Sequence, residues 1–274
     1  MKKRGVTVLL TVLLAVCLLG MERIKEERRE ALREVNADSR TGGESLADGG
    51  ESTSDGTEPE EKLAALTFDD GPHESCTPKL LEGLRERDVK ATFFLIGKSI
   101  AGKEEIVKKM AEDGHLIGSH TFSHVQLTKL PVEEACREIT MTNEAIYTVT
   151  GQQPEYIRPP YGSWDSELEC AVNMKEVGWT VDPRDWDVKN TDAVVKRVLE
   201  KVEDGSIILL HDVYDTSVEA AFRIIDELKA RGYTFVTVDL LLLDLESTSS
   251  GQDSRFSRSS HSRIFFSYPI SVGS

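Results

Sequence analysis

Residues 62–72 read Lys-Leu-Ala-Ala-Leu-Thr-Phe-Asp-Asp-Gly-Pro and begin the folded part of this chain. Residues 63–68 form a short apolar run, which is typical of a buried strand. Gly71-Pro72 then ends the strand, so the carboxylates Asp69 and Asp70 stand at its carboxyl end. Because side chains alternate along a strand, the two carboxylates point in different directions and can serve different purposes. Taken alone, the same letters are equally typical of a solvated turn.

The alternation of a short apolar run with an amphipathic helical stretch repeats through residues 62–244. This pattern favours an α/β fold in which parallel strands are joined by right-handed helical crossovers. Periodicity alone does not separate a barrel from an open doubly wound sheet, but in both the functional groups gather at the carboxyl ends of the strands. We predict strands at 63–68, 91–96, 115–119, 156–158, 178–181, 206–210 and 234–238, and helices at 77–87, 104–113, 132–148, 166–177, 191–202 and 217–231.

The composition limits the classes of partner. The 274 residues carry a formal net charge of -15, which disfavours non-specific binding to nucleic acid or anionic lipid and suits a neutral glycan. Hydrophobic residues make up 39%, enough for a packed core. The four cysteines, Cys17, Cys76, Cys136 and Cys170, include no C-x-x-C pair, which argues against a cysteine zinc site. Three of them lie in the globular part, where at most one disulfide could form, so the fold is not a disulfide-stapled one.

The two ends differ from the body in composition. Residues 1–21, with Lys-Lys-Arg before an uncharged apolar run, predict a signal peptide or an N-terminal membrane anchor, so we expect an extracytoplasmic protein, secreted or membrane-anchored. The run of 16 residues at 6–21 is shorter than the roughly 20 of a full span, and cleavage stays open. Residues 22–61 predict a charged stalk and a disordered linker. Residues 245–274 predict a Ser-rich, disordered tail, which leaves 62–244 as the folded domain.

A pair of histidines follows the third predicted strand. His120 and His124 stand at i and i+4, a spacing that places two imidazoles on one face of a helical turn. Two histidines and one carboxylate make a three-ligand metal site with open positions, the catalytic rather than the structural type. The alternative is two surface histidines. The chain has only six histidines, so this spacing is not expected by chance.

Three more polar clusters follow later strands: Arg-Pro-Pro-Tyr-Gly at 158–162, Asp-Pro-Arg-Asp-Trp at 182–186, and His211 after Ile-Ile-Leu-Leu at 207–210. Arginine can orient a carboxylate, and a histidine beside a carboxylate can donate a proton. Here Asp212 is adjacent to His211, and Asp185 belongs to the neighbouring unit. Each cluster alone is equally well explained as a rigid turn or a structural histidine. Five clusters, each just past a strand, favour one functional rim.

In their order along residues 63–243, these five motifs resemble those of the polysaccharide deacetylases, the NodB-homology group that forms carbohydrate esterase family 4. The resemblance is strongest to bacterial peptidoglycan N-acetylglucosamine deacetylases. It implies a distorted barrel of about seven parallel strands.

The resemblance also implies a role for each matching residue. Asp69 is the expected catalytic base, and Arg158 orients it. His211 is the expected general acid, and Asp185 tunes it. The remaining site residues are the expected metal ligands Asp70, His120 and His124, and the substrate-binding residues Tyr161 through its backbone N–H, Trp186 as a wall of the sugar groove and Leu209 as the pocket for the acetyl methyl group.

The implied activity is metal-dependent hydrolysis of N-acetyl groups on N-acetylglucosamine residues of peptidoglycan, with release of acetate. Zinc is the expected ion, and cobalt, nickel or iron also suit the ligands. The expected partner is the N-acetylated glycan polymer, bound by a monomer. A chitooligosaccharide deacetylase or an O-acetyl xylan esterase would share this machinery. A non-haem iron oxygenase would use two histidines and a carboxylate without needing Asp69, His211 or Arg158, and a glycan-binding module would need no turnover.

Overall fold

The computed structural model describes residues 62–165, 168 and 173–251. The predicted export segment, the stalk with its linker, and the tail from residue 252 lie outside the described residues. Within the described part of the chain, no helix combines the length and the apolar character that a bilayer span requires.

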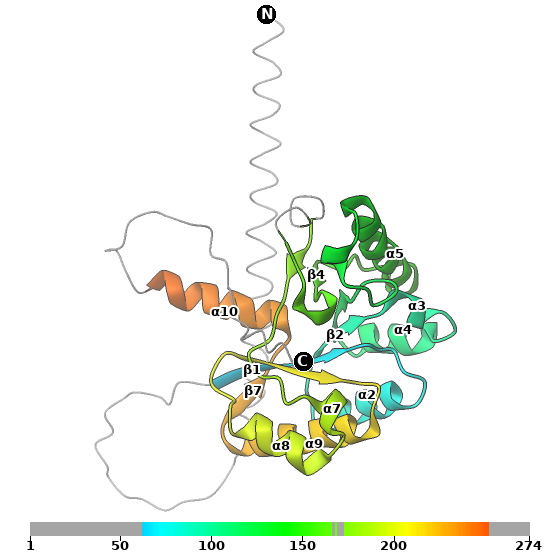
Figure 1. Cartoon of the computed structure of the whole chain (residues 1–274). Helices are drawn as coiled ribbons and strands as arrows, with labels where there is room; N and C mark the ends of the chain where they lie inside the picture. The colour runs from blue at the N-terminus through cyan, green and yellow to red at the C-terminus, as the bar shows by residue number, and fades with distance from the viewer. Residues whose placement is uncertain (1–61, 166–167, 169–172, 252–274) are drawn as a thin grey trace, which may run out of the picture. The chain divides into compact units, whose positions relative to one another are not determined.

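The described residues form one sheet of seven parallel strands (Figure 1). The strands run in the order β5-β4-β3-β2-β1-β6, and β7 also pairs with β1. Parallel pairing throughout confirms the prediction from the alternating pattern. The bounds are β1 Lys62–Asp69, β2 Thr92–Leu95, β3 Leu116–Ser119, β4 Tyr156–Ile157, β5 Lys175–Glu176, β6 Ser206–His211 and β7 Tyr233–Phe235.

The sheet curls into a distorted half-barrel around β1. One edge of β1 pairs with β6 from Ala64 to Asp69, while the other edge pairs with β7 at its start and β2 at its end. The chain after β5 returns toward the opposite edge, where Val181 forms a bridge with Ile208 of β6. The carboxyl ends of the strands therefore face a common centre, as the barrel prediction required.

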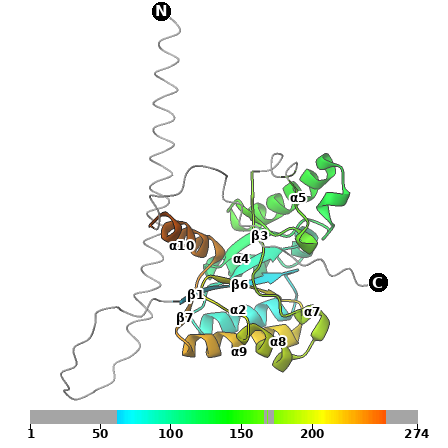
Figure 2. The same ribbon diagram turned by 60° about the vertical axis from the view of Figure 1, so that its left-hand side comes forward.

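Helices flank the sheet, and α2, α8 and α9 lie together on one side of it (Figure 2). The start of α8 and the end of α5 have clear local causes. Asn190 caps α8 by accepting a hydrogen bond from the N–H of Ala193, and Gly151 ends α5 at φ 71°, a conformation that glycine adopts without strain. The bounds are α2 Cys76–Glu86, α3 Gly97–Ile100, α4 Glu104–Glu112, α5 Val132–Thr150, α7 Asp185–Val188, α8 Thr191–Leu199, α9 Asp215–Ala230, α10 Val238–Gly251, and the 3-10 turns η1 Leu127–Lys129 and η2 Pro160–Gly162.

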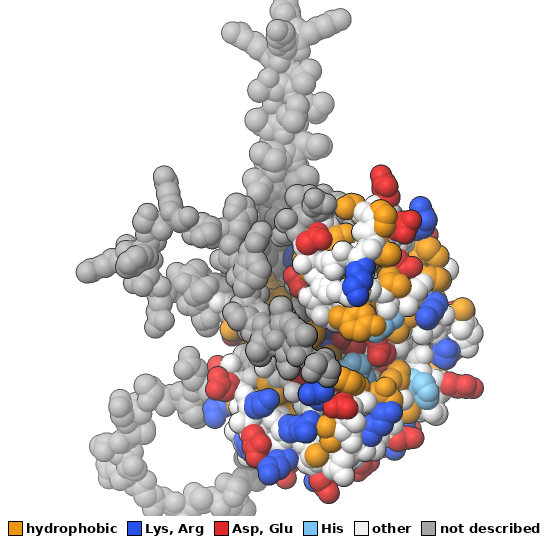
Figure 3. Space-filling view, viewed as in Figure 1, with side chains coloured by type: hydrophobic (Ala, Val, Ile, Leu, Met, Phe, Trp, Pro, Cys, Tyr) orange, Lys and Arg blue, Asp and Glu red, His pale blue; other side chains and the backbone are white. Residues whose placement is uncertain are grey.

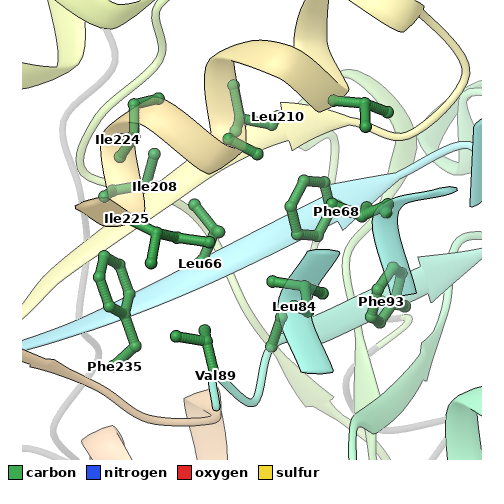
Figure 4. Packing of buried hydrophobic residues seen from close by; sticks show 14 of the residues in the cluster. Leu66, Phe68, Leu84, Val89, Phe93, Ile208, Leu210, Ile224, Ile225 and Phe235 are labelled. Carbon is green, nitrogen blue, oxygen red and sulfur yellow. The ribbon is translucent and has the colours of Figure 1, made fainter. Parts of the chain in front are cut away.

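The main core fills the space between the sheet and these helices (Figure 4). Leu66 and Phe68 of β1 and Ile208 and Leu210 of β6 point into it, against side chains of α2 and α9. Burying one such side chain contributes roughly 1.5–3 kcal/mol, so the register of β1 and β6 is strongly fixed. Because side chains alternate, the residues between these, and Asp69 above all, face the interior of the half-barrel.

The segment between η2 and α7 departs from the prediction. Of the helix predicted at 166–177, residues 166–167 and 169–172 lie outside the described residues, and residues 175–176 form the edge strand β5. Of the strand predicted at 178–181, only Val181 makes a bridge. The apolar residues within 166–177 have a helical spacing, which predicts a helix. Backbone pairing of Tyr156 and Ile157 with residues 175–176 overrides that local preference.

The end of the domain also differs. The strand predicted at 234–238 stops at Phe235, and Val238 begins α10. The helix continues to Gly251, so residues 245–251 of the predicted tail are helical. Leu241 is fully buried, and its burial explains why an apolar run beside a Ser-rich tail folds as a helix.

Candidate active site

The predicted site residues meet at the carboxyl ends of the strands. Asp69 ends β1, His211 ends β6, and the two are direct partners in the register of these neighbouring strands. His120 follows β3, and Arg158 follows β4. In Figure 3 histidine and acidic side chains gather near the middle of the face shown, with hydrophobic side chains beside them.

Asp70, His120 and His124 form a donor set that fits one divalent ion. Their ligand atoms all lie within 4.8 Å of one another. Oδ1 of Asp70 is 3.5 Å from Nε2 of His120 and 3.3 Å from Nε2 of His124. Two ligands that each lie about 2.0–2.1 Å from a tetrahedral zinc ion are about 3.3 Å apart. This Oδ1 atom is buried and has no hydrogen-bond partner among the described residues, as expected of an atom that a cation would contact.

The two histidines come together through a loop, and the helical turn predicted for them is wrong. No helix covers 120–124, and Thr121 and His124 have φ values of 64° and 58°. The backbone N–H groups of Gly97 and Lys98 hold the loop by donating to the carbonyls of Thr121 and Phe122. The imidazole centroids are still only 5.0 Å apart, so the spacing predicted the proximity but not its cause.

His120 is oriented from behind. Its Nδ1 lies 2.6 Å from the backbone carbonyl oxygen of Arg158. Because a carbonyl only accepts, Nδ1 carries the proton and Nε2 presents its lone pair toward Asp70. Burial lowers the pKa of His120, against the opposing charges of Asp69 and Asp70, and thus favours the neutral imidazole that a metal needs.

Asp69 is fixed by a fully buried arginine. Nη1 of Arg158 donates to Oδ1 of Asp69 at 2.9 Å and to Oγ1 of Thr67 at 2.7 Å. Its Nε and Nη2 donate to the carbonyls of Val177 and Gly178, and its guanidinium lies over the ring of Phe94, 4.3 Å from the centroid. A buried ion pair is tolerated only when its donors are satisfied in this way. Asp69 is therefore held in one orientation.

His211 is fixed by a carboxylate. Nδ1 of His211 is 2.8 Å from Oδ1 of Asp185, and the backbone N–H of His211 donates to Oδ2 at 2.8 Å. Asp185 is the first residue of α7 and is fully buried. Burial alone would lower the pKa of His211, but the hydrogen bond and charge of Asp185, helped by Asp69 and Asp70, raise it to about 9. The contacts with Asp185 thus favour the protonated imidazole.

Three further predicted residues surround these groups. Tyr161 is 69% exposed, with its ring centroid 5.2 Å from that of His124, and Trp186 is 43% exposed beside the guanidinium of Arg184. Leu209 is buried two residues before His211 on the same side of β6. Exposed aromatic rings thus stand near the metal ligands and Asp185, while an apolar side chain lies beneath.

Other positions were missed or misread. Thr67 was not singled out, although its hydroxyl accepts from Arg158 and donates to the carbonyl of Ile208. Its position two residues before Asp69 on the same face was the available signal. Asp212 lies beside His211 in sequence, yet Asp185 holds the imidazole. Cys76 is the first residue of α2 and is buried in the core, away from the polar groups of the site.

Comparison with known proteins decides the family. The family model for polysaccharide deacetylases matches residues 56–180. A chitooligosaccharide deacetylase of Bradyrhizobium sp. is 35% identical over 186 residues, which cover 61% of this chain and 85% of the relative. The chain belongs to the polysaccharide deacetylase family.

Other members of the polysaccharide deacetylase family are also similar. Peptidoglycan-N-acetylglucosamine deacetylase PgdA of Listeria monocytogenes is 41% identical over 180 residues, which are 66% of this chain but only 39% of that relative. The solved structure of peptidoglycan deacetylase PdaC from Bacillus subtilis has a TM-score of 0.68 and 38% identity and covers 71% of this chain and 97% of that one. A family 4 acetyl xylan esterase from Clostridium thermocellum, solved with a cobalt ion, has a TM-score of 0.64 and 35% identity, with coverage of 68% and 92%. The half-barrel is thus the family's fold.

Proposed function

We propose that this chain hydrolyses the N-acetyl group of N-acetylglucosamine residues in peptidoglycan and releases acetate. One observation carries the proposal. A carboxylate paired with an arginine and an imidazolium paired with a carboxylate stand side by side on β1 and β6, next to a three-ligand cation site. That arrangement supplies a proton acceptor and a proton donor at one substrate position.

The proposed roles follow from these contacts. Asp69 accepts a proton from the attacking water, and Arg158 keeps its carboxylate oriented toward the site. His211 gives its proton to the nitrogen of the leaving amine, since its raised pKa keeps the proton available. Asp185 stabilises that cation and fixes the ring. A divalent ion held by the neighbouring ligands would supply Lewis acidity, which polarises the acetamide carbonyl and makes water a better nucleophile at neutral pH.

The substrate class rests on the exposed groups and on the relatives. Tyr161 and Trp186 offer aromatic faces to a sugar ring, and the backbone N–H of Tyr161 is the proposed donor to the oxyanion. Leu209 is the proposed contact for the acetyl methyl group. PgdA and PdaC are named for peptidoglycan, which favours the wall polymer over chitin oligomers or acetyl xylan. We propose zinc as the ion, as the two-histidine, one-carboxylate set favours, with cobalt, nickel or iron as alternatives.

The place of action follows from the sequence of residues 1–21 and from the substrate. A wall polymer lies outside the cytoplasm, so the enzyme is proposed to act there, secreted or anchored to the membrane through its N-terminal segment only. The acidic net charge of -15 favours a neutral glycan over nucleic acid. A monomer suffices, since the described residues contribute every group of the site from one chain.

Acetate release tests the proposal. The purified chain with added zinc is incubated in parallel with peptidoglycan, chitin oligomers and acetyl xylan. We expect the parent protein to release acetate from the substrates that contain N-acetylglucosamine, and fastest from peptidoglycan. We expect no acetate from the His124→Ala protein. Faster release from chitin oligomers or acetyl xylan would reassign the substrate. No acetate from any of the three, with oxygen consumed when iron is supplied, would replace the deacetylase by an oxygenase.

A further inference from the structure

Asp212 is a buried carboxyl group that the proposed chemistry does not use. It follows His211, but its side chain points to the opposite side of the strand, toward the start of α2. Both the residue and its carboxyl are fully buried. Oδ2 accepts a hydrogen bond from the hydroxyl of Thr77, and Oδ1 is without a hydrogen-bond partner within the described ranges.

The carboxyl of Asp212 lies directly against the loop that carries a metal ligand. Gly71 follows Asp70, and a Cβ atom added to Gly71 would lie 2.5 Å from both carboxyl oxygens of Asp212. Only glycine therefore allows this approach. Asp70 itself has φ 75°, a conformation that a non-glycine residue adopts only when its surroundings impose it.

Thr77 extends the contact to the far end of the same loop. Its Oγ1 donates to Asp212 and also accepts from the backbone N–H of His73, at 2.7 Å. Asp212 thus touches the loop at Gly71 directly and at His73 through Thr77. On its other side it is joined covalently to His211, whose ring Asp185 holds.

The chemistry of the group argues against a merely space-filling role. Burial raises the pKa of Asp212 to about 7, despite the opposing hydrogen bond from Thr77. A buried carboxyl with one unpaired oxygen costs stability, and an apolar side chain of similar volume would avoid that cost. What such a side chain would lose is the hydrogen bond to Thr77 and the flat contact with Gly71.

We propose that Asp212 is a positioning residue, which locks the loop bearing the ligand Asp70 to the strand bearing His211. The inference rests on the proposed function for the roles of Asp70 and His211. The pairing of β1 with β6 places Asp69 beside His211, and Asp212, which is neither a metal ligand nor a proton donor, adds a second constraint on the loop that carries Asp70.

Zinc affinity of the purified protein gives a readout that is independent of turnover. Competition with a chromophoric chelator measures it for the parent, Asp212→Ala, Asp212→Asn and Thr77→Val. Loss of groups that orient a metal ligand typically weakens binding about 10–100-fold. We expect a loss of that size for Asp212→Ala and a smaller loss for Thr77→Val. Asp212→Asn keeps the shape and an acceptor oxygen, so it should restore affinity to within about threefold of the parent.

Thr92→Val is the matched control. Thr92, the first residue of β2, is also a fully buried threonine, and its hydroxyl accepts from the backbone N–H of Val238 at the start of α10 rather than from the loop that carries Asp70. Both threonine variants should lower the melting temperature, but only Thr77→Val should weaken zinc binding. In zinc-saturated protein, Asp212→Ala should lower kcat more than it raises KM.

The outcomes separate the two proposals. Parental zinc affinity in Asp212→Ala, or equal losses in Thr77→Val and Thr92→Val, would overturn the positioning role. If Asp212→Ala fails to fold, the two threonine variants and Asp212→Asn decide the question alone. A parent that binds zinc but releases no acetate would refute the deacetylase function, while the order of zinc affinities would still test the lock.

Discussion

The two sides of the site use the same device with opposite charge. On the β1 side a carboxylate, Asp69, is held by the buried cation of Arg158. On the β6 side an imidazole, His211, is held by the buried anion of Asp185. The first partner fixes the orientation of a proton acceptor, and the second raises the pKa of a proton donor. Neighbouring strands therefore carry a proposed base and a proposed acid, each beside its own buried counter-charge.

The largest expected effect comes from removing the cation site, which both sides share. His120→Ala removes one of the three ligands and also the hydrogen bond to the backbone carbonyl of Arg158. We expect bound metal and acetate release to disappear together, to the background of the assay. Metal content after dialysis and acetate release are measured on the same sample. One bound equivalent of zinc in this variant would remove the ligand assignment.

The next largest effect concerns the ion pair on the β1 side. Arg158→Met leaves Asp69 buried without its counter-charge, and breaking a buried ion pair typically costs about 3–5 kcal/mol. Urea unfolding should show a loss of this size. Arg223→Met is the control, since Arg223 pairs with Asp192 at the surface and exposed pairs contribute about 1 kcal/mol or less. Equal losses in the two variants would mean that the Arg158 pair is not special.

The pH dependence of activity tests the pairing on the β6 side. His211 must be protonated to act as an acid, so activity should fall as pH rises through its pKa, near 9. Asp185→Asn removes the charge that favours the imidazolium, so this basic limb should move to lower pH, toward the ordinary value of about 6.5. The pH dependence of kcat/KM measures it. Asp187→Asn, on the exposed side of α7, should leave the limb in place. If the basic limb of the Asp185→Asn protein stays in place, His211 does not determine that limb.

Much of this comparison could be predicted from the sequence, because motifs at strand ends converge in any parallel α/β fold. The nearness of Asp69 and His211 could be expected from the buried strands that precede them, whereas their roles as base and acid were implied by the resemblance to the polysaccharide deacetylases. The loop conformation of residues 120–124, with positive φ at Thr121 and His124, could not be predicted. It is held by hydrogen bonds from the backbone of α3. Strand β5 and the direction of Asp212 could not be predicted either. Both depend on contacts with residues distant in sequence, which local spacing does not encode.

In the proposed mechanism Asp69 and His211 act on protons, while other residues hold the metal. Zinc stoichiometry and acetate release, measured on the same samples of Asp69→Asn and His211→Ala protein, separate these two kinds of role. We expect one equivalent of zinc in both variants, as in the parent, and acetate release lowered by ~10²–10⁴-fold in each. Near-parental acetate release by His211→Ala would refute its role as the acid, and loss of zinc from Asp69→Asn would make Asp69 a metal ligand.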